Sequence, residues 1–516
     1  MSVPGLSYFS QNTTKFWLIV AVVVITRLLY LGDIPAGLNQ DEAYAGYEAF
    51  SIFTTGADSW GYRFPIYLMA WGSGMNALYS YLTIPFLALF GVGALAIRMP
   101  QALLGILSCC FFYHLASLVY GKKIGLWAFF LSAIVPVHIM ASRWGLECNV
   151  APFFIVVGFY FYMKSFHNMA FLFASSLFYA LGVYSYACCG VYIVFTYLFQ
   201  LLCLFLNKCS KKTCLDVIFA GLLFTLFMTP YLLFIAINQG MIPEITSDFL
   251  TLPKLLVWRG GEIGWSNFLH KAQNLWHILY YGHDSLIWNS IKEYGLLYSI
   301  SLPFLLVGFC RVLWGIYQEI KNKTIGNNII FGGTLMIGFL YGCLIEPNVN
   351  RINFLWFNLI LTLAVGLDFL CQKKQVKILV VLVYLLFFTS FCWFYFGQYN
   401  LVAKWHFEPD MGPSLQLAKK YHERTGYPVY LVAAPHYPKL LFYNQISPSE
   451  YQQTVQWHRF PAYYLSPKSI SFYYFKPGDY GHIANDIIYV IPKEKKYLFG
   501  PFDKIDVGMY SVVVPR

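Results

Sequence analysis

Long runs of apolar residues, separated by short polar segments, occupy the chain up to about residue 396. A helix needs about 20 mostly apolar residues to cross a hydrocarbon core about 30 Å thick, so we expect about eleven membrane-spanning helices. They lie near residues 16–31, 101–120, 124–141, 150–164, 169–187, 190–207, 214–236, 296–314, 327–345, 353–370 and 378–396. The first run is interpreted as a retained helix and not a signal peptide, because it contains Arg27 and lacks a small-x-small cleavage site.

One further apolar run, residues 76–95, is interrupted by Pro85 and Gly91. If this run lies in the headgroup plane, the basic clusters between the later runs fall on the same side as Lys15, and the positive-inside rule makes that side the cytoplasm. If the run spans, those clusters move to the side opposite Lys15. We therefore predict an interfacial helix. The N-terminus is then cytoplasmic, and the predicted outer loops are 33–100, 142–149, 237–295 and 346–352.

The pattern changes after residue 396. Polar and apolar positions now alternate in short segments, which is typical of strands in a soluble domain. The predicted strands and the one predicted helix lie at 428–434, 470–475, 486–491 and 509–514, and at 414–425. We expect two domains, a membrane domain over 1–396 and a soluble extracytoplasmic α/β domain over 397–516.

Composition agrees with the membrane interpretation. Hydrophobic residues make up 58% of the chain and charged residues only 11%, and the mean hydropathy is +0.55, which excludes an ordinary soluble protein. The net charge of +11 comes largely from clusters between the apolar runs, so it indicates topology and not nucleic-acid binding. None of the twelve cysteines lies in the tail or has metal-ligand spacing.

The first outer loop contains two neighbouring carboxylates, Asp41 and Glu42, shortly after the first helix. A carboxylate near the membrane surface can stay ionised and accept the proton of a hydroxyl group. The alternative is a solvated loop or a helix N-cap, because a helix-compatible stretch follows Asp41.

Two short outer loops carry an arginine each, which opposes the positive-inside bias. Arg143 and Glu147 lie in one loop, and Glu346 and Arg351 lie in the other. A guanidinium fork suits a phosphate group. The alternative is that each arginine forms a structural bridge to the glutamate of its own loop.

The remaining polar residues of the outer loops allow several interpretations. His277 and His283 could contribute to a metal site, but three ligands are not recognisable, so we expect no metal. Tyr79 fits an aromatic anchor at the membrane interface. Asp58 and Arg63 are close enough in sequence to pair with each other.

The order of these motifs resembles the GT-C glycosyltransferase superfamily, in the branch of the protein O-mannosyltransferases and the aminoarabinose transferase. The resemblance is clearest over residues 33–160. It rests on Asp41-Glu42-Ala43-Tyr44, the Gly-x-Arg-x-Pro stretch 61–65, Leu78-Tyr79, Ile97-Arg98-Met99-Pro100 and Ser142-Arg143-Trp144-Gly145-Leu146-Glu147.

The resemblance implies a GT-C-like, α-helical polytopic membrane protein with interfacial helices and a small C-terminal α/β domain. The implied activity is transfer of a hexose or pentose, with inversion, from a polyprenyl-phosphate carrier to a glycan, lipid or protein on the outer face of a bacterial membrane. Asp41 is implied as the general base, Glu42 as a supporting residue, and Arg143 and Arg351 as ligands of the donor phosphate. The implied substrate-binding residues are Tyr44, Asp58, Arg63, Tyr79, Arg98 and Glu147. No cofactor is implied, although some relatives use a divalent metal.

Two other functions stay open. A transporter or flippase of lipid-linked sugars would place ionisable residues at mid-bilayer and show internal repeats, whereas Arg27 and Asp216 lie close to the ends of their runs. A polysaccharide polymerase or ligase would rely on a long later outer loop, for which 237–295 is long enough.

Overall fold

The computed structural model describes residues 4–207, 210–258, 263–481 and 483–516. The chain forms two compact units. The first comprises residues 1–30, 101–231 and 260–399, and the second comprises residues 31–100, 232–259 and 400–516. Each unit is assembled from three separate stretches of sequence. The division into domains at residues 396 and 397 stays a prediction.

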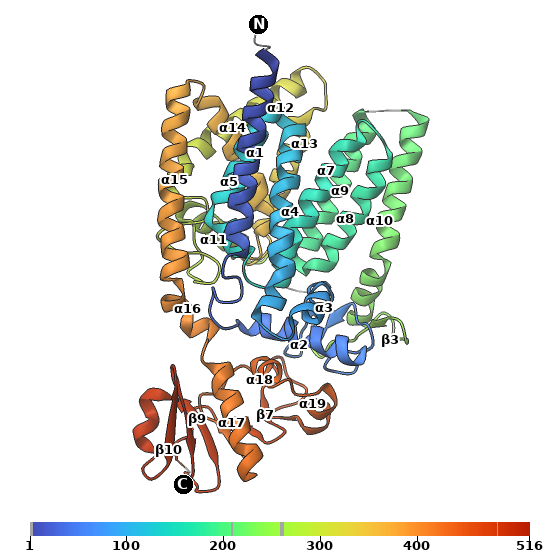
Figure 1. Ribbon diagram of the computed structural model, residues 1–516. Coiled ribbons are helices and arrows are strands. Elements are labelled where there is room, and N and C mark those ends of the chain that lie inside the picture. The colour runs from blue at the N-terminus through green and yellow to red at the C-terminus, as the bar shows by residue number, and fades with distance from the viewer. Residues whose placement is uncertain (1–3, 208–209, 259–262, 482) are drawn as a thin grey trace. The chain divides into compact units, whose positions relative to one another are not determined.

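The first unit is a bundle of helices (Figure 1). Its helices are α1 (Pro4–Leu28), α4 (Ala94–Tyr120), α5 (Lys122–Ile134), α6 (Pro136–Ala141), α7 (Ala151–Ser165), α8 (Ala170–Ser185), α9 (Ala187–Asn207), α10 (Lys211–Asn238), α11 (Phe268–Tyr281), α12 (Leu302–Lys321), α13 (Asn327–Gly342), α14 (Trp356–Leu370) and α15 (Lys374–Gly397). The first residues of α4 and the last residues of α10 belong to the second unit.

Neighbouring helices of the first unit pack in one continuous series. α7 packs against α8, α8 against α9, α9 against α13, α13 against α12, α12 against α14, and α14 against α5. The backbones of α12 and α14 are in close contact at Gly308 and Gly366, where an added Cβ would lie 2.0 Å from the Thr362 carbonyl oxygen and 1.9 Å from that of Phe304. Small residues permit such close backbone contact between helices in a membrane.

Every predicted span contains a helix, but one prediction of a single continuous helix is wrong. The run 124–141 is divided into α5 and α6, because Val135 is extended and Pro136 opens the second helix. Proline has no backbone N–H and fits the first position of a helix better than its interior. α12 also begins later than predicted, at Leu302, after a short 3₁₀ turn (Ser299–Ser301).

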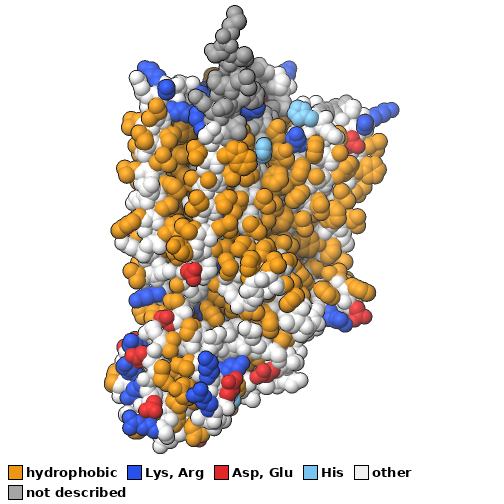
Figure 2. All heavy atoms as spheres, in the orientation of Figure 1, with side chains coloured by type: hydrophobic (Ala, Val, Ile, Leu, Met, Phe, Trp, Pro, Cys, Tyr) orange, Lys and Arg blue, Asp and Glu red, His pale blue; other side chains and the backbone are white. Residues whose placement is uncertain are grey.

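Seven helical stretches among the described residues are long and apolar enough to cross a membrane. They are Ala94–Tyr120, Glu147–Ser165, Ala187–Asn207, Lys211–Asn238, Ser299–Lys321, Asn353–Leu370 and Lys374–Gly397. Apolar side chains cover the visible face of these helices (Figure 2), and Leu226 of α10 and Leu386 of α15 are among the exposed ones. The chain is therefore a multi-pass membrane protein.

Basic residues gather at one end of the first unit (Figure 2). The Lys123 ammonium lies 3.0 Å from the Asp368 carboxylate. Lys377 lies near Lys15, Lys123 and Asp368, although these residues come from four different helices. The grouping agrees with the charge pattern of the sequence. The side of the membrane that this end faces stays a prediction.

The second unit contains short helices and a sheet. Its elements before the tail are α2 (Gln40–Thr55), α3 (Leu78–Phe90) and the paired strands β1 (Tyr67–Leu68), β2 (Met75–Asn76), β3 (Ile245–Thr246) and β4 (Thr251–Leu252). The run 76–95 thus forms the 13-residue helix α3. At 1.5 Å per residue this helix is about 20 Å long, which is too short to cross a core about 30 Å thick.

The tail folds around a seven-stranded sheet in the order β10-β11-β9-β5-β8-β7-β6. The strands are β5 (Val429–Leu431), β6 (Gln456–Trp457), β7 (Pro467–Ile470), β8 (Tyr473–Phe475), β9 (Ile488–Pro492), β10 (Asp503–Val507) and β11 (Tyr510–Val514). β5 pairs in parallel with β8 and β9, and the other pairs are antiparallel. The helices of the tail are α16 (Tyr399–Phe407), α17 (Met411–Thr425), α18 (Tyr437–Tyr443) and α19 (Pro448–Thr454).

Each predicted strand and the predicted helix of the tail overlaps an element of the structure. α17 packs against β9 and β11 and buries Leu415 and Ala418. Sequence reasoning missed β10, because three of the five residues of this edge strand are charged and the strand is largely exposed. Charges on an edge strand discourage pairing with other chains, and they also weaken the apolar signal of a strand.

Candidate active site

The Asp41-Glu42 pair lies in the first turn of α2, in the second unit. Asn39 is the N-cap residue, and its side-chain oxygen accepts a hydrogen bond from the Asp41 backbone N–H at 3.0 Å. The Glu42 carboxylate in turn accepts a hydrogen bond from the Asn39 backbone N–H at 3.0 Å. This capping box satisfies the start of the helix. The Asp41 carboxylate is not needed for it.

Glu42 is held by Arg98 in a buried ion pair. The Arg98 Nε atom lies 2.8 Å from Glu42 Oε1 and Nη2 lies 3.0 Å from Oε2, and both side chains are fully buried. Arg98 also donates to the carbonyl oxygens of Pro35 at 2.6 Å and Gly37 at 2.8 Å. The arginine therefore fixes the chain that leads into α2, and its predicted role in substrate binding stays a prediction.

Asp41 is the half-buried member of the pair. Burial and, second, the neighbouring Glu42 raise the pKa of Asp41 to about 6, while Lys439 lowers it. A carboxylate with this pKa is about ten-to-one ionised at pH 7, and it is a stronger base than an ordinary aspartate. The side chain is thus suited to remove a proton from a hydroxyl group.

A further acid, Glu48, lies later in α2 and was missed from the sequence, and Asp58, which was predicted, follows the end of this helix. Glu48 is fully buried and accepts hydrogen bonds from the Ser59 backbone N–H at 2.8 Å and from the Ser59 hydroxyl. Burial raises the pKa of Glu48 to about 7. Burial and then the nearby Glu48 raise the pKa of Asp58 well above its usual range. Glu48 comes seven residues after Asp41, which places both on one helix face.

Other predicted substrate-binding residues of this unit make structural contacts. Asp58 is buried, and its Oδ1 accepts hydrogen bonds from the backbone N–H groups of Trp60 and Tyr62. The predicted pairing of Asp58 with Arg63 is wrong, because the exposed Arg63 pairs with Asp248 at 3.2 Å.

Tyr44 and Tyr79 are also buried. Tyr44 packs on Trp71 with ring centroids 5.4 Å apart. The Tyr79 hydroxyl donates to the Ile97 carbonyl oxygen at 2.6 Å, so Tyr79 is not an exposed interface anchor.

Arg143 lies in the first unit and caps the C-terminal end of α1. Its guanidinium donates to the carbonyl oxygens of Thr26 at 2.9 Å, Arg27 at 3.1 Å, Leu29 at 2.7 Å and Tyr30 at 3.3 Å. A cation is favourable at a helix C-terminus, where carbonyl groups lack partners. The side chain is fully buried, so this arrangement gives Arg143 a structural role. Its role in phosphate binding stays a prediction.

Glu147, Glu346 and Arg351 lie in two loop regions of the first unit. Glu147 begins a short 3₁₀ helix (Glu147–Val150) and is nearly buried. Glu346 accepts a hydrogen bond from the Asn274 side chain at 2.8 Å. Arg351 is half-buried and donates to the Glu346 backbone carbonyl oxygen at 3.3 Å. The structure thus leaves Arg351 less enclosed than Arg143.

His277 and His283, the two histidines that could contribute to a metal site, have ring centroids 5.8 Å apart. In the described part of the chain, no group of three or more His, Cys, Asp or Glu side chains could hold a metal ion. Asp284, next to this pair, accepts hydrogen bonds from the Asn289 side chain at 2.6 Å and the Val349 backbone N–H at 3.0 Å. It therefore joins two loops of the first unit.

Comparison with known proteins identifies the fold. The sequence matches no protein-family model and no curated protein at a significant level. The structure is similar to ArnT from Cupriavidus metallidurans in the apo state, with a TM-score of 0.52, 11% identity, and 98% of each chain covered. It is also similar to the same protein bound to undecaprenyl phosphate, with a TM-score of 0.50, 12% identity, and coverage of 97% of this chain and 98% of that one. This chain has the GT-C fold.

The GT-C fold confirms the fold class predicted from the order of the sequence motifs. An oligosaccharyltransferase from Archaeoglobus fulgidus gives a TM-score of 0.45 at 13% identity over 83% of this chain. The chain spans only 63% of the length of that protein.

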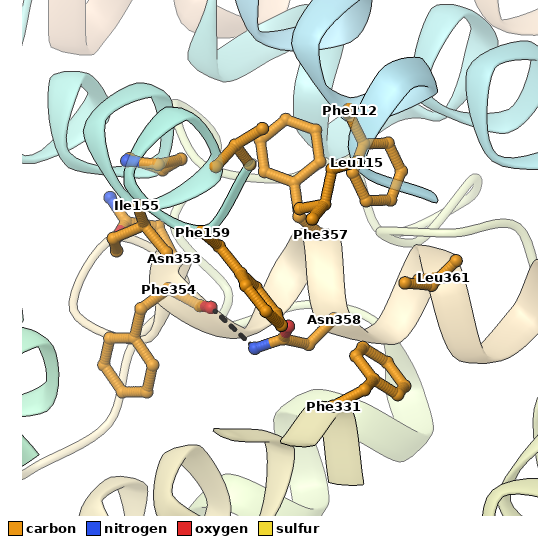
Figure 3. A pocket seen from close by; sticks show the side chains of 12 residues that line it. Phe112, Leu115, Ile155, Phe159, Phe331, Asn353, Phe354, Phe357, Asn358 and Leu361 are labelled. Carbon is orange, nitrogen blue, oxygen red and sulfur yellow. Dashed lines mark hydrogen bonds between the residues drawn. The ribbon is translucent and has the colours of Figure 1, made fainter. Parts of the chain in front are cut away.

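The chain also encloses a small cavity in its first unit (Figure 3). Two asparagines, Asn353 and Asn358, are the polar residues among the twelve that line it, and the rest are apolar. The Asn358 amide donates to the Phe354 carbonyl oxygen at 3.4 Å. Because its lining holds no acid, base or thiol, this cavity is a packing feature and not a catalytic centre.

Proposed function

We propose that this chain is a glycosyltransferase that moves a sugar from a polyprenyl-phosphate carrier to a hydroxyl group of a glycan, lipid or protein. The observation that carries the proposal is the Asp41 carboxylate, which stands at the start of α2 with a raised pKa and outside the capping box that Glu42 completes. The full-length similarity to ArnT, of which one structure contains undecaprenyl phosphate, supports the choice of donor.

The proposed reaction is a single displacement. The Asp41 carboxylate accepts the proton of the acceptor hydroxyl, and the acceptor oxygen forms a bond to the anomeric carbon of the sugar. The bond between that carbon and the carrier phosphate breaks, and its electron pair leaves on the phosphate oxygen. One displacement inverts the anomeric configuration.

The carrier phosphate needs a cation. Arg143 and Arg351 are the proposed ligands, and Arg351 is the better suited of the two within its unit, because the Arg143 guanidinium already binds four backbone carbonyl groups. A preorganised donor of this kind commonly contributes about 3 kcal/mol to the stabilisation of a transition state. We further propose that the reacting loop and the tail face the outside of a bacterial cell.

The proposal can be tested without knowledge of the acceptor. The purified full chain is reconstituted in vesicles with polyprenyl-phosphate hexoses and pentoses and with cell-envelope extract as the source of acceptors. Polyprenyl phosphate released from the donor is then measured by mass spectrometry. Release that requires both the extract and Asp41 is the expected result. No release from any donor would count against the proposal.

The rate of transfer is expected to depend on pH through Asp41. The base must be ionised, and burial raises the pKa of Asp41 to about 6. Below that pH, kcat/KM should therefore fall about tenfold per pH unit, and above pH 7 it should be nearly constant. The measurement is the initial rate between pH 4.5 and 8.5. A rate that increases toward low pH would contradict the base assignment.

Transfer is also expected to survive removal of divalent metals. The proposed base and the proposed cations are all side chains, and no metal takes part in the proposed step. Incubation with excess EDTA followed by gel filtration should lower the rate less than twofold. A large loss of activity that Mn²⁺ or Mg²⁺ restores would require a metal in the mechanism.

A further inference from the structure

α18, a helix of the tail, packs along α2 within the second unit. The Phe442 ring lies over Gly46, where an added Cβ would be 2.9 Å from the nearest ring atom. The Tyr47 hydroxyl donates to the Ile446 carbonyl oxygen at 2.9 Å. The later residue of α2 contacts the later residue of the tail, so the two segments run in the same direction. Lys439 lies one helical turn before Phe442 in α18, and it interacts electrostatically with Asp41 and Glu42 in the first turn of α2.

A second connection brings the same part of the tail to the Asp41 loop. The Leu38 backbone N–H donates to the Phe407 carbonyl oxygen at 2.9 Å, and the next residue, Glu408, lies 2.5 Å from the Lys439 ammonium. Lys439 is 1% exposed. Burial of an ammonium group is costly without a partner, so the Glu408 carboxylate explains how the lysine can stay charged there.

Several other ionisable groups surround this point. Glu42 and its partner Arg98 lie on α2 and α4. Glu408 also accepts a hydrogen bond from the Tyr510 hydroxyl of β11 at 3.4 Å. His406 of α16 and His436, which precedes α18, both interact electrostatically with Lys439 and Glu408. Among these described groups, Lys439 is the cation whose charge lowers the pKa of Asp41, while Arg98 pairs with Glu42.

We propose that Lys439 is a positioning residue of the active site, a cation supplied by the C-terminal tail that keeps the Asp41 carboxylate ionised. This inference rests on the proposed function of Asp41 as the base. It gives the tail a direct part in the reaction, because folding of α18 against α2 completes the electrostatic surroundings of the base. The lysine itself transfers no proton and does not touch the substrate.

The effect has a definite sign. Lys439 lowers the pKa of Asp41, and burial together with Glu42 raises it to about 6. Lys439→Met removes the positive charge that lowers the pKa of Asp41, whereas burial and Glu42 still raise this pKa. The Asp41 carboxyl group should therefore stay protonated to higher pH. A unit charge several ångströms away, at an effective dielectric constant near 20, changes a pKa by about one unit or more.

The test measures protonation of Asp41 directly. A carbodiimide reacts with protonated carboxyl groups, and peptide mass spectrometry of the full chain in detergent gives the labelled fraction of Asp41 as a function of pH. The labelling midpoint should move upward by about one pH unit in Lys439→Met. It should stay near the wild-type value in Lys439→Arg, which keeps the charge, and in Lys420→Met, which removes an exposed lysine of α17.

A second variant keeps the inference testable if Lys439→Met does not fold. Lys439→Met leaves the Glu408 carboxylate without its lysine, whereas Glu408→Gln/Lys439→Met removes both charges of the pair, a change that proteins often tolerate. The midpoint should move upward in this double variant as well. An unchanged midpoint in either folded variant would overturn the inference. That result is separate from the proposed function, which fails if Asp41→Asn still transfers sugar.

The pH dependence of the transfer rate should change in the same direction as the pKa of Asp41. With Lys439→Met, the acid limb of the pH–rate profile should move upward with the labelling midpoint, so that activity lost at pH 6.5 returns at pH 8.5. Lys439→Arg should restore the wild-type profile. A uniform loss of rate at every pH would show a purely structural role for the lysine and would overturn the inference.

Discussion

Replacement of Asp41 by Asn is expected to lower sugar transfer by about 10²–10⁴-fold, the usual contribution of a positioned general base. The amide has the shape of the carboxylate but cannot accept the proton of the acceptor hydroxyl. Binding of the polyprenyl-phosphate donor should change little, because the charge of the carrier is not paired with Asp41 in the proposed reaction. The measurement is release of polyprenyl phosphate under single-turnover conditions.

The Asp41→Asn variant should also be as stable as the wild type at pH 7, or more stable. The folded state raises the pKa of Asp41 from 3.8 to about 6, so the folded chain binds a proton more tightly than the unfolded chain does. The contribution of Asp41 to the free energy of unfolding is therefore lost as pH rises through 6. The neutral amide side chain of the variant does not titrate, so the variant has no such loss. Loss of activity together with a lower unfolding temperature would indicate damage to the fold and not removal of a base.

Replacement of Arg98 by Met is expected to destabilise the second unit by about 3–5 kcal/mol, the cost of leaving one member of a buried ion pair without its partner. The change leaves the Glu42 carboxylate buried and removes the donors that bind the Pro35 and Gly37 carbonyl groups. Thermal unfolding of the purified chain in detergent measures the effect. The folded yield should fall together with the unfolding temperature.

Two matched variants distinguish loss of the buried Arg98–Glu42 pair from the general effect of replacing an arginine by methionine. Arg63→Met breaks the exposed pair with Asp248 and should cost less than about 1 kcal/mol. Glu42→Gln in the Arg98→Met background removes the orphaned charge and should recover part of the lost stability. Equal stability of Arg98→Met and Arg63→Met would refute the structural role assigned to the buried pair.

The helices could be predicted from sequence because runs of apolar residues have to match the thickness of a membrane. Their exact limits could not, because local features decide them. Pro136 divides one predicted span into two helices, and the charged edge strand β10 lacks an apolar pattern. The short length of α3 agrees with the loop-charge argument for residues 76–95.

The candidate site could be predicted only in part. Adjacency of Asp41 and Glu42 singled out the pair, but their different roles depend on Arg98, which lies 56 residues after Glu42. For Arg143, the sequence left phosphate binding and a bridge to Glu147 open, and it gave no sign that the guanidinium binds backbone carbonyl groups at the end of α1, more than 100 residues earlier. Contacts of this kind leave no local pattern.

Two residues had a signal that was not used. Glu48 is a single acid in an apolar stretch and shares a helix face with Asp41. Lys439 is a single base within the largely apolar segment Tyr437–Tyr443. A lone charge in such a stretch is costly to bury unless it has a partner, so each predicted a polar contact, although neither showed with which residue.

The role of Asp41 is tested most directly in the cells that make this protein. The measured quantity is the amount of each polyprenyl-phosphate-linked sugar. Lipids are extracted from cells that carry the wild-type gene, the Asp41→Asn gene or no copy, and the carriers are compared by mass spectrometry. The account predicts that one polyprenyl-phosphate sugar accumulates equally in the Asp41→Asn cells and in the cells without the gene. A pool in the Asp41→Asn cells that matches the wild type, while the cells without the gene accumulate the donor, would contradict it.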